Sequence, residues 1–265
     1  MASRTKQKEE ARARRLADER ARAERAARTR RLQWIGGTVV AAIVVVVVAI
    51  AVSSGGGGNS ASGLQKGGAA NTTVASVNQL LAGIPQSGAV LGNPSAPVTM
   101  TYYGDLECPI CRDFTLNGGF PQLVANEVRQ GKVKLQYRAF QTATQNPQTF
   151  QTQQVAALAA GKQNKFWHYA ELFYRQQGQE DTGYVTDAYL TGLAQQVTGL
   201  NLSEWQSARN DPALVSQVQA DVAAGTAANV QGTPTLIFTG PKGTASPSQG
   251  VPSYSQLQQA INQVS

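Results

Sequence analysis

The chain has 265 residues, of which 42% are hydrophobic, a composition that supports at least one folded domain with an apolar core. Its net charge of +7 comes entirely from residues 1–33, which hold twelve Lys or Arg and five Asp or Glu, whereas the rest of the chain has a net charge of zero. The folded part is therefore not a basic domain of the kind that binds nucleic acid.

Residues 1–33 are rich in Arg, Ala, Glu and Gln, which favour helix, and several acidic residues stand four positions before an Arg. Because few large apolar residues are present, this segment is predicted to be a basic cytoplasmic arm, either a solvated helix or a fraying tail. An alternative is an arm that binds anionic lipids or a partner protein.

Residues 34–52 are predicted to form a single transmembrane helix. Ile35–Val52 contains no charged residue, and a helix of that length spans about 27 Å, close to the thickness of a hydrocarbon core. Trp34 stands at its edge as an aromatic anchor, and the basic arm places the N-terminus in the cytoplasm by the positive-inside rule. Everything after this helix is then extracytoplasmic. The competing interpretation is a cleaved signal peptide, because Ala49-Ile50-Ala51 resembles a cleavage site.

Residues 53–75 are predicted to be a flexible linker, because they are rich in Gly, Ser, Asn and Ala and include Gly55–Gly58. Residues 76–265 are predicted to be the folded domain that this linker tethers to the membrane. Within its first part, Leu80–Leu91 is interpreted as a lead-in segment with a candidate edge strand.

From Val98 onward, runs of β-branched and aromatic residues predict strands, and apolar residues at helical spacing predict helices. In chain order the predicted elements are a strand Val98–Tyr103, an interrupted helix Cys111–Gln130, a strand Val133–Phe140, a helical stretch over about 145–229, a strand Thr235–Thr239, a hairpin-like loop Gly240–Gly250 and a helix Ser253–Val264. This order predicts an α/β domain interrupted by an all-helical insertion.

The motif with the most chemical content is Cys108-Pro109-Ile110-Cys111. Its cysteines are the only two in the chain, and the motif follows a predicted strand and opens a predicted helix. The unpaired N–H groups and the dipole of a helix N-terminus stabilise a thiolate, and Pro109 suits the first turn. The pattern predicts a redox-active pair in which Cys108 is the thiolate and Cys111 is a buried resolving thiol.

Three other kinds of Cys-x-x-Cys site fit less well. A haem attachment needs His after the second cysteine, where this chain has Arg112. A structural zinc site would need carboxylates or a second chain to complete four ligands, since the chain has two Cys and one His. A purely structural disulfide over so short a span would be strained. The last two alternatives stay open, but redox chemistry is favoured and no metal is predicted.

A second motif, Gly232-Thr233-Pro234-Thr235, stands at the start of the last predicted strand. Proline cannot donate a ladder hydrogen bond and is therefore suited to the first position of a strand. Alone the motif indicates only a turn, and it gains weight beside the cysteine pair.

Taken together, residues Val98–Val264 resemble the DsbA family of the thioredoxin superfamily. The resemblance rests on three segments: Tyr103-Gly104-Asp105-Leu106-Glu107-Cys108-Pro109-Ile110-Cys111, Gly232-Thr233-Pro234-Thr235, and Ala156–Phe173. It implies a thioredoxin-like fold with an inserted all-helical subdomain, preceded here by the single transmembrane helix. It also implies that the Thr233–Pro234 bond is cis, faces the Cys108 sulfur and offers its backbone to an extended substrate strand.

The resemblance implies a protein thiol–disulfide oxidoreductase without a cofactor. The expected reaction is oxidation of dithiols in unfolded or partly folded proteins outside the cytoplasm, with reoxidation by a membrane partner of the DsbB or VKOR kind. Two alternatives are a disulfide reductase or isomerase on the same fold and a non-catalytic peptide-binding chaperone. The intact cysteine pair argues against the chaperone.

Two positions depart from the family pattern. Strongly oxidising members often have His between the cysteines, whereas Ile110 offers Cys108 no charge or hydrogen bond, so a milder oxidant is expected. Many relatives have a buried carboxylate six residues before the first cysteine, where this chain has Tyr102. Asp105 and Glu107 are interpreted as solvated loop acids rather than as substitutes.

The remaining candidates are given structural roles. His168, the only histidine, is far from the cysteines in sequence and is predicted to be structural. The aromatic residues between Phe166 and Tyr174 are predicted to pack in the core rather than to line a cofactor site.

Overall fold

The computed structural model describes residues 63–247 and 250–265. The predicted arm 1–33, the predicted transmembrane helix 34–52 and residues 53–62 of the predicted linker lie outside the described residues. Among the residues that are described, no helix combines the length and the apolarity needed to cross a bilayer.

Six strands of the described part form one mixed sheet in the order β1-β2-β4-β3-β5-β6. The strands are β1 (Gln86–Ser87), β2 (Val90–Leu91), β3 (Val98–Gly104), β4 (Val133–Ala139), β5 (Thr235–Gly240) and β6 (Gly243–Ala245). The central strand β3 runs parallel to β4 and antiparallel to β5. Every second residue of β4 is buried, the alternation expected of a strand with one face on the core.

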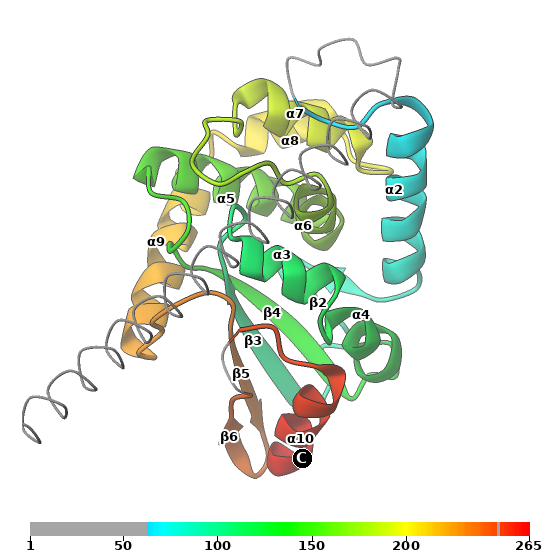
Figure 1. The fold of residues 1–265 in the computed structure, drawn as a ribbon, viewed down its shortest axis with the longest axis vertical. Helices are drawn as coiled ribbons and strands as arrows, with labels where there is room; N and C mark the ends of the chain where they lie inside the picture. Colours follow the sequence, from blue (N-terminus) through cyan, green and yellow to red (C-terminus); the bar gives the residue numbers. More distant parts are fainter. Residues whose placement is uncertain (1–62, 248–249) are drawn as a thin grey trace, which may run out of the picture. The chain divides into compact units, whose positions relative to one another are not determined.

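The helices are α2 (Gly67–Leu81), α3 (Pro109–Leu116), α4 (Phe120–Leu123), the π-helical turn η1 (Val124–Val128), α5 (Pro147–Gly161), α6 (Phe166–Arg175), α7 (Asp187–Gln196), α8 (Leu202–Ala208), α9 (Pro212–Ala227) and α10 (Tyr254–Val264). The segment between β4 and β5 contains helices α5 to α9 and no strand. Figure 1 shows α5 to α8 gathered at one end, with α3 between them and the strands, and β6 and α10 at the opposite end. The fold is therefore a mixed α/β sheet domain with a helical insertion.

Local sequence explains where several of these helices begin. The side chains of Asn146, Thr186, Asn201 and Asp211 each accept a hydrogen bond from a backbone N–H in the first turn of the helix that follows. Ser253 completes a capping box at α10 and confirms the predicted N-cap.

The predicted boundary of the linker at residue 75 is wrong, because α2 begins at Gly67. Ala70, Val77 and Leu81 of α2 are buried and Val74 packs against the core, so these four residues form one apolar stripe at helical spacing. The stripe packs on α6. Small residues and threonines between its members hid this period behind a linker-like composition.

The core is continuous between the sheet and the insertion. Trp167 of α6 stacks on Phe120 of α4 with ring centroids 5.7 Å apart, and Tyr137 of β4 packs against Phe166 at 4.9 Å. These aromatic residues are almost completely buried, which confirms their predicted packing role. His168 lies on the same helix, where its Nδ1 is 3.1 Å from Nε2 of Gln86.

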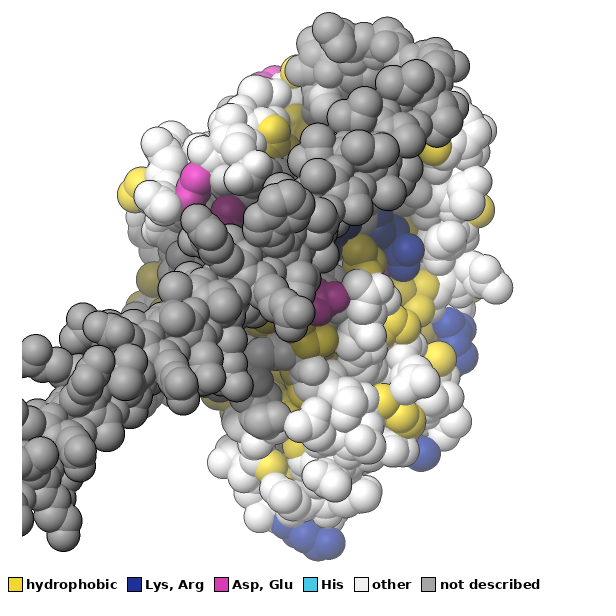
Figure 2. Space-filling model, viewed as in Figure 1, with side chains coloured by type: hydrophobic (Ala, Val, Ile, Leu, Met, Phe, Trp, Pro, Cys, Tyr) yellow, Lys and Arg dark blue, Asp and Glu magenta, His cyan; other side chains and the backbone are white. Residues whose placement is uncertain are grey.

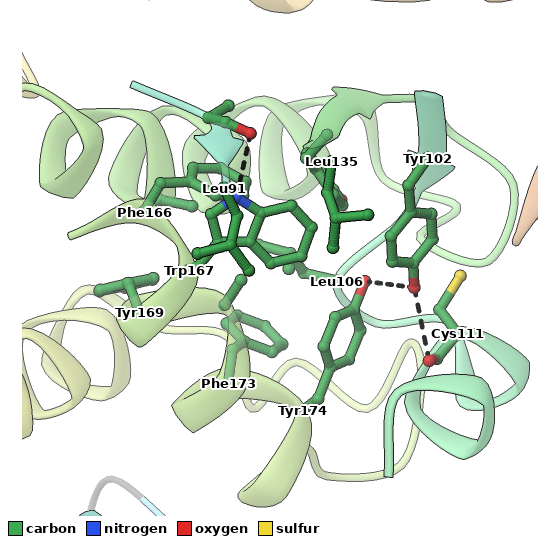
Figure 3. Close-up of a cluster of buried hydrophobic side chains, with 14 of the residues drawn as sticks. Leu91, Tyr102, Leu106, Cys111, Leu135, Phe166, Trp167, Tyr169, Phe173 and Tyr174 are labelled. Atoms are coloured by element: carbon green, nitrogen blue, oxygen red, sulfur yellow. Dashed lines mark hydrogen bonds between the residues drawn. The ribbon is translucent and has the colours of Figure 1, made fainter. Parts of the chain in front are cut away.

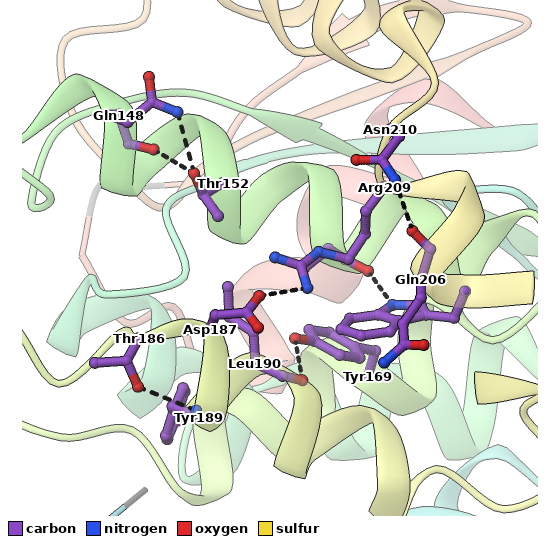
Figure 4. A network of polar contacts seen from close by, with 12 residues as sticks. Gln148, Thr152, Tyr169, Thr186, Asp187, Tyr189, Leu190, Gln206, Arg209 and Asn210 are labelled. Atoms are coloured by element: carbon purple, nitrogen blue, oxygen red, sulfur yellow. Dashed lines mark hydrogen bonds and ion pairs between the residues drawn. The ribbon is translucent and has the colours of Figure 1, made fainter. Parts of the chain in front are cut away.

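A polar cleft lies within the insertion, between α5, α7 and α8 (Figure 4). Arg209 forms an ion pair with Asp187 there and lies 4.8 Å above the ring of Trp205. The Trp205 Nε1 donates to the carbonyl oxygen of Ala156, so the cluster ties α8 to α5. We assign it a structural role.

Charged groups agree with the neutral balance of the folded part. On the part of the face in Figure 2 that the described residues form, Lys and Arg side chains lie in separate small groups.

Candidate active site at the cysteine pair

The topology of the sheet brings three loops to one edge. Because β3 and β4 are parallel, with Gly104 opposite Ala139, the loops that follow both strands leave the sheet on the same side. Because β5 is antiparallel to β3, with Thr235 opposite Tyr103, the loop before β5 arrives at that same side. The cysteine motif follows β3, so it lies beside the Thr233–Pro234 segment.

Cys108 lies at the N-terminus of a helix, as predicted, and is the N-cap of α3. Its Sγ accepts a hydrogen bond from the backbone N–H of Cys111 at 3.2 Å, and Pro109 occupies the first helical turn. Only 4% of Cys108 is exposed, whereas Ile110, two residues later, is 46% exposed. The helix terminus therefore holds the Cys108 sulfur in place, while the next two residues, Pro109 and Ile110, face solvent.

The Thr233–Pro234 peptide bond is cis, and the Thr233 carbonyl oxygen lies 3.3 Å from the Cys108 Sγ, which donates to it. Both features were expected from the family resemblance and both are confirmed. Beside Pro234 a groove of about 210 Å³ is lined mainly by prolines and β5 residues, among them Leu236, Pro247 and Pro252.

The pKa values of the two thiols are shifted in opposite directions. The pKa of Cys108 is lowered to about 7, first by the hydrogen bond with the Cys111 side chain, then by the Thr233 side chain and the N–H groups of Cys111 and Ile110, against the opposing effect of burial. Burial raises the pKa of Cys111, which is fully buried, and the nearby Cys108 adds to this rise. At neutral pH the first sulfur is thus partly a thiolate and the second a thiol.

Neutral hydroxyl groups surround Cys111 (Figure 3). The Tyr102 hydroxyl lies 3.4 Å from the Cys111 carbonyl oxygen, from the Thr115 hydroxyl and from the Tyr174 hydroxyl. Burial raises the pKa of Tyr102 well above its usual value, so this phenol is uncharged. The side chain at the position of the family's buried carboxylate is therefore a neutral hydrogen-bonding group.

The interpretation of Asp105 and Glu107 as solvated acids is wrong. Asp105 is fully buried, and its carboxylate accepts hydrogen bonds from three consecutive backbone N–H groups of Thr142–Thr144. Glu107 is 2% exposed, and burial raises its pKa. Both acids follow the end of β3, where the insertion covers them, and that cover is not visible in a local sequence pattern.

The insertion also contacts this loop directly. Nε2 of Gln177, just after α6, donates to the carbonyl oxygens of Leu106 at 2.7 Å and of Cys108 at 3.2 Å. The sequence prediction did not include Gln177 or Thr142–Thr144. For Thr142–Thr144 the available signal was their position, since a loop that follows β4 must reach the edge at which the loop after β3 ends.

A zinc site receives no support from the geometry. Among residues 63–247 and 250–265, no group of three or more His, Cys, Asp or Glu side chains is arranged to hold a metal ion. Cys108 and Cys111 are both free thiols in this structure. The arrangement is suited to reversible formation of a disulfide between them.

Comparison with known proteins agrees with this chemistry. The profile of a family described as thioredoxin matches residues 86–263, more than half of the chain. Disulfide bond formation protein D of Bacillus subtilis is 27% identical over 152 residues, a match that covers 56% of this chain and 65% of that protein, just under two thirds of its length. The Na(+)/H(+) antiporter NhaA 1 of Salinispora arenicola is 29% identical over 158 residues, 59% of this chain but only 22% of that protein.

A solved structure shows the same fold. The crystal structure of oxidised BdbD from Bacillus subtilis superposes with a TM-score of 0.57 at 23% identity, covering 67% of this chain and 94% of that one. The sheet domain and its helical insertion thus have a counterpart of known structure.

Reaction of the reduced protein with iodoacetamide is expected to reach half its maximal rate near pH 7, because only the Cys108 thiolate reacts and its pKa is lowered to about 7. The rate rises with pH through this value, whereas an ordinary cysteine has its midpoint at about pH 8.5. In a Cys111→Ala variant the midpoint should move upward, since the largest cause of the shift is removed. An unshifted midpoint near that of an ordinary cysteine in the wild-type protein would contradict the assignment.

Proposed function

This chain belongs to the thioredoxin family, and we propose that it is a DsbA-like thiol–disulfide oxidoreductase that acts outside the cytoplasm, chiefly by oxidising dithiols in unfolded proteins. The observation that carries the proposal is the position of the Cys108 sulfur, between the Cys111 N–H and the Thr233 carbonyl oxygen. The name of the Bacillus subtilis relative, disulfide bond formation protein D, supports the oxidising direction.

The proposed reaction begins with the pair oxidised. A substrate thiolate attacks the Cys108 sulfur, a bond forms between these two sulfurs, and the bond to Cys111 breaks. The Cys111 sulfur leaves with the electron pair and takes up a proton, which its raised pKa favours. A second substrate thiolate then attacks the substrate sulfur of the mixed disulfide, and Cys108 leaves as the thiolate that the helix N-terminus stabilises. The substrate has lost two electrons and the enzyme has gained them.

The size of the Cys108 shift indicates a moderate oxidant. At pH 7 a thiol with a pKa of about 7 is about half ionised, so ionisation of Cys108 favours the dithiol form only slightly. Burial keeps Cys111 protonated at this pH and adds little. A strongly oxidising potential would therefore need other contributions.

The cis-proline loop supports the proposed substrate. The Thr233 backbone faces the reacting sulfur, and an extended chain could pair with it in the manner of an added strand. The groove beside Pro234 adjoins this backbone and is lined by both polar and apolar residues. We propose Thr233 and Pro234 as substrate-binding residues, Cys108 and Cys111 as the catalytic pair, and Pro109 and Ile110 as the dipeptide that sets its environment.

We further propose that residues 34–52 anchor the chain in the membrane with the arm 1–33 in the cytoplasm. The charge distribution supports this topology, because the basic residues directly precede the apolar segment. A membrane partner of the DsbB or VKOR kind would then reoxidise the pair, and a shared membrane surface would raise its effective concentration.

A Cys108→Ala variant is expected to lose all oxidation of a reduced, unfolded protein, because no sulfur remains for the substrate to attack. A Cys111→Ser variant supplied with an oxidised low-molecular-weight disulfide should instead accumulate a mixed disulfide on Cys108, visible by mass spectrometry. An Arg112→Ala variant, which alters an exposed residue of α3, serves as the control and should remain active. Full oxidation by Cys108→Ala would contradict the assignment, and if wild-type protein and Cys108→Ala both only suppress aggregation of the unfolded protein, the result points to a chaperone.

The direction of exchange is tested by equilibrating the full-length protein with defined ratios of reduced and oxidised glutathione. A potential more oxidising than the glutathione poise supports an oxidase, and we expect roughly −180 mV, which is the value of protein disulfide isomerase. A value near about −270 mV, which is typical of thioredoxin, would favour a reductase.

The topology is tested with reporter fusions. Alkaline phosphatase, which folds only outside the cytoplasm, should be active when fused after residue 265 and inactive when it replaces everything after residue 33. The reverse result would contradict an extracytoplasmic domain, and release of the fusion into the medium would indicate a cleaved signal peptide.

A further inference from the structure

We propose that Asp105 is a positioning residue that sets the cis-proline loop against Cys108 through Thr142. This inference rests on the proposed exchange function. It concerns an acid that does not contact the reacting sulfur, and its evidence is a continuous series of hydrogen bonds.

The first step is the binding of the carboxylate. One oxygen of Asp105 accepts from the backbone N–H groups of Thr142 at 3.0 Å, Ala143 at 3.0 Å and Thr144 at 2.9 Å. Three successive N–H groups aimed at one oxygen form a concave anion site. The loop after β4 therefore takes its shape around this acid.

The second oxygen binds three further groups. It accepts from the Thr144 hydroxyl at 2.6 Å, the Glu107 N–H at 3.2 Å and Nε2 of Gln153 at 3.3 Å. Gln153 is on the insertion helix α5, and Glu107 directly precedes Cys108. Among the described residues no Lys or Arg forms an ion pair with Asp105, so hydrogen bonds alone satisfy this buried charge.

The second step leads from this loop to the reacting sulfur. The hydroxyls of Thr142 and Thr233 hydrogen-bond to each other, and the Thr233 carbonyl oxygen lies 3.3 Å from the Cys108 Sγ. Asp105 thus holds the chain on both sides of the site: the residue before Cys108, and the loop that holds Thr233. A carboxylate is required because donors approach both oxygens, and an amide would present its own N–H groups to at least one set of them.

The consequence is selective. An extended peptide needs the Thr233 backbone in register with Cys108, whereas glutathione needs little more than access to the sulfur. Small misplacements of reacting groups cost rate steeply, up to about a hundredfold for 1 Å. Loss of the Thr142 hydroxyl should therefore slow peptide exchange more than glutathione exchange.

The test measures rate constants for mixed-disulfide formation by the full-length oxidised protein with an unstructured dithiol peptide and with glutathione. Thr142 is exposed, so Thr142→Val should fold normally. We expect it to lower the peptide rate about tenfold while changing the glutathione rate less than twofold, and Thr142→Ser to restore the peptide rate. Asp105→Asn should lower the peptide rate at least as much, after correction for the folded fraction.

Matched controls are Thr226→Val, which removes an exposed hydroxyl of α9, and Asp113→Asn, which removes a carboxylate of α3. If Thr142→Val behaves like Thr226→Val, or slows both substrates equally, the inference is overturned. If the wild-type protein reacts with neither substrate, the proposed function fails instead, so the two failures are distinguishable.

Discussion

The position of β3 between a parallel and an antiparallel neighbour is the constraint on which the site depends. It sends the loops after β3 and β4, and the loop before β5, to one edge of the sheet. Backbone hydrogen bonds thereby bring together segments more than a hundred residues apart, such as Cys108 and Thr233. The insertion fits between β4 and β5 without disturbing this edge and supplies contacts to it from Gln153 and Gln177.

Hydrogen bonds with Cys111 at the helix terminus lower the pKa of Cys108, and burial raises the pKa of Cys111. Cys108 has N–H donors that stabilise its anion, whereas Cys111 is fully buried and is held as a thiol. The pKa values shift in opposite directions because Cys108 is the N-cap of α3, whereas Cys111, one helical turn later, is fully buried. The same sequence spacing elsewhere would not produce them, because neither the N-terminal N–H groups nor the cover from the insertion would be present.

Local sequence patterns predicted the features that neighbouring residues in the chain determine, such as strands and helix N-termini. The strand before Cys108, the N-cap position of that cysteine and the capped helix at Ser253 were all predicted from residue types and spacing, and the cis bond at Pro234 followed from the family resemblance. Asp105 was misassigned because its burial depends on the loop after β4 and on α5, and no local signal reports either. The linker prediction failed at Gly67 because the Gly, Ala and Thr content of α2 resembles that of a linker and obscures the helical spacing of its few apolar residues.

The chain has no cysteine besides Cys108 and Cys111, so the only covalent loop it can close within itself is the one its proposed chemistry opens. The reference state is the same cysteine pair in the unfolded chain. Relative to it, a thermodynamic cycle makes two quantities equal: the free energy with which the folded site oxidises a substrate, and the difference in folding free energy between the reduced and the disulfide-bonded form. In an oxidant of this kind the reduced form is the more stable one, because the Cys108 thiolate that the N–H of Cys111 stabilises exists only when the bridge is open.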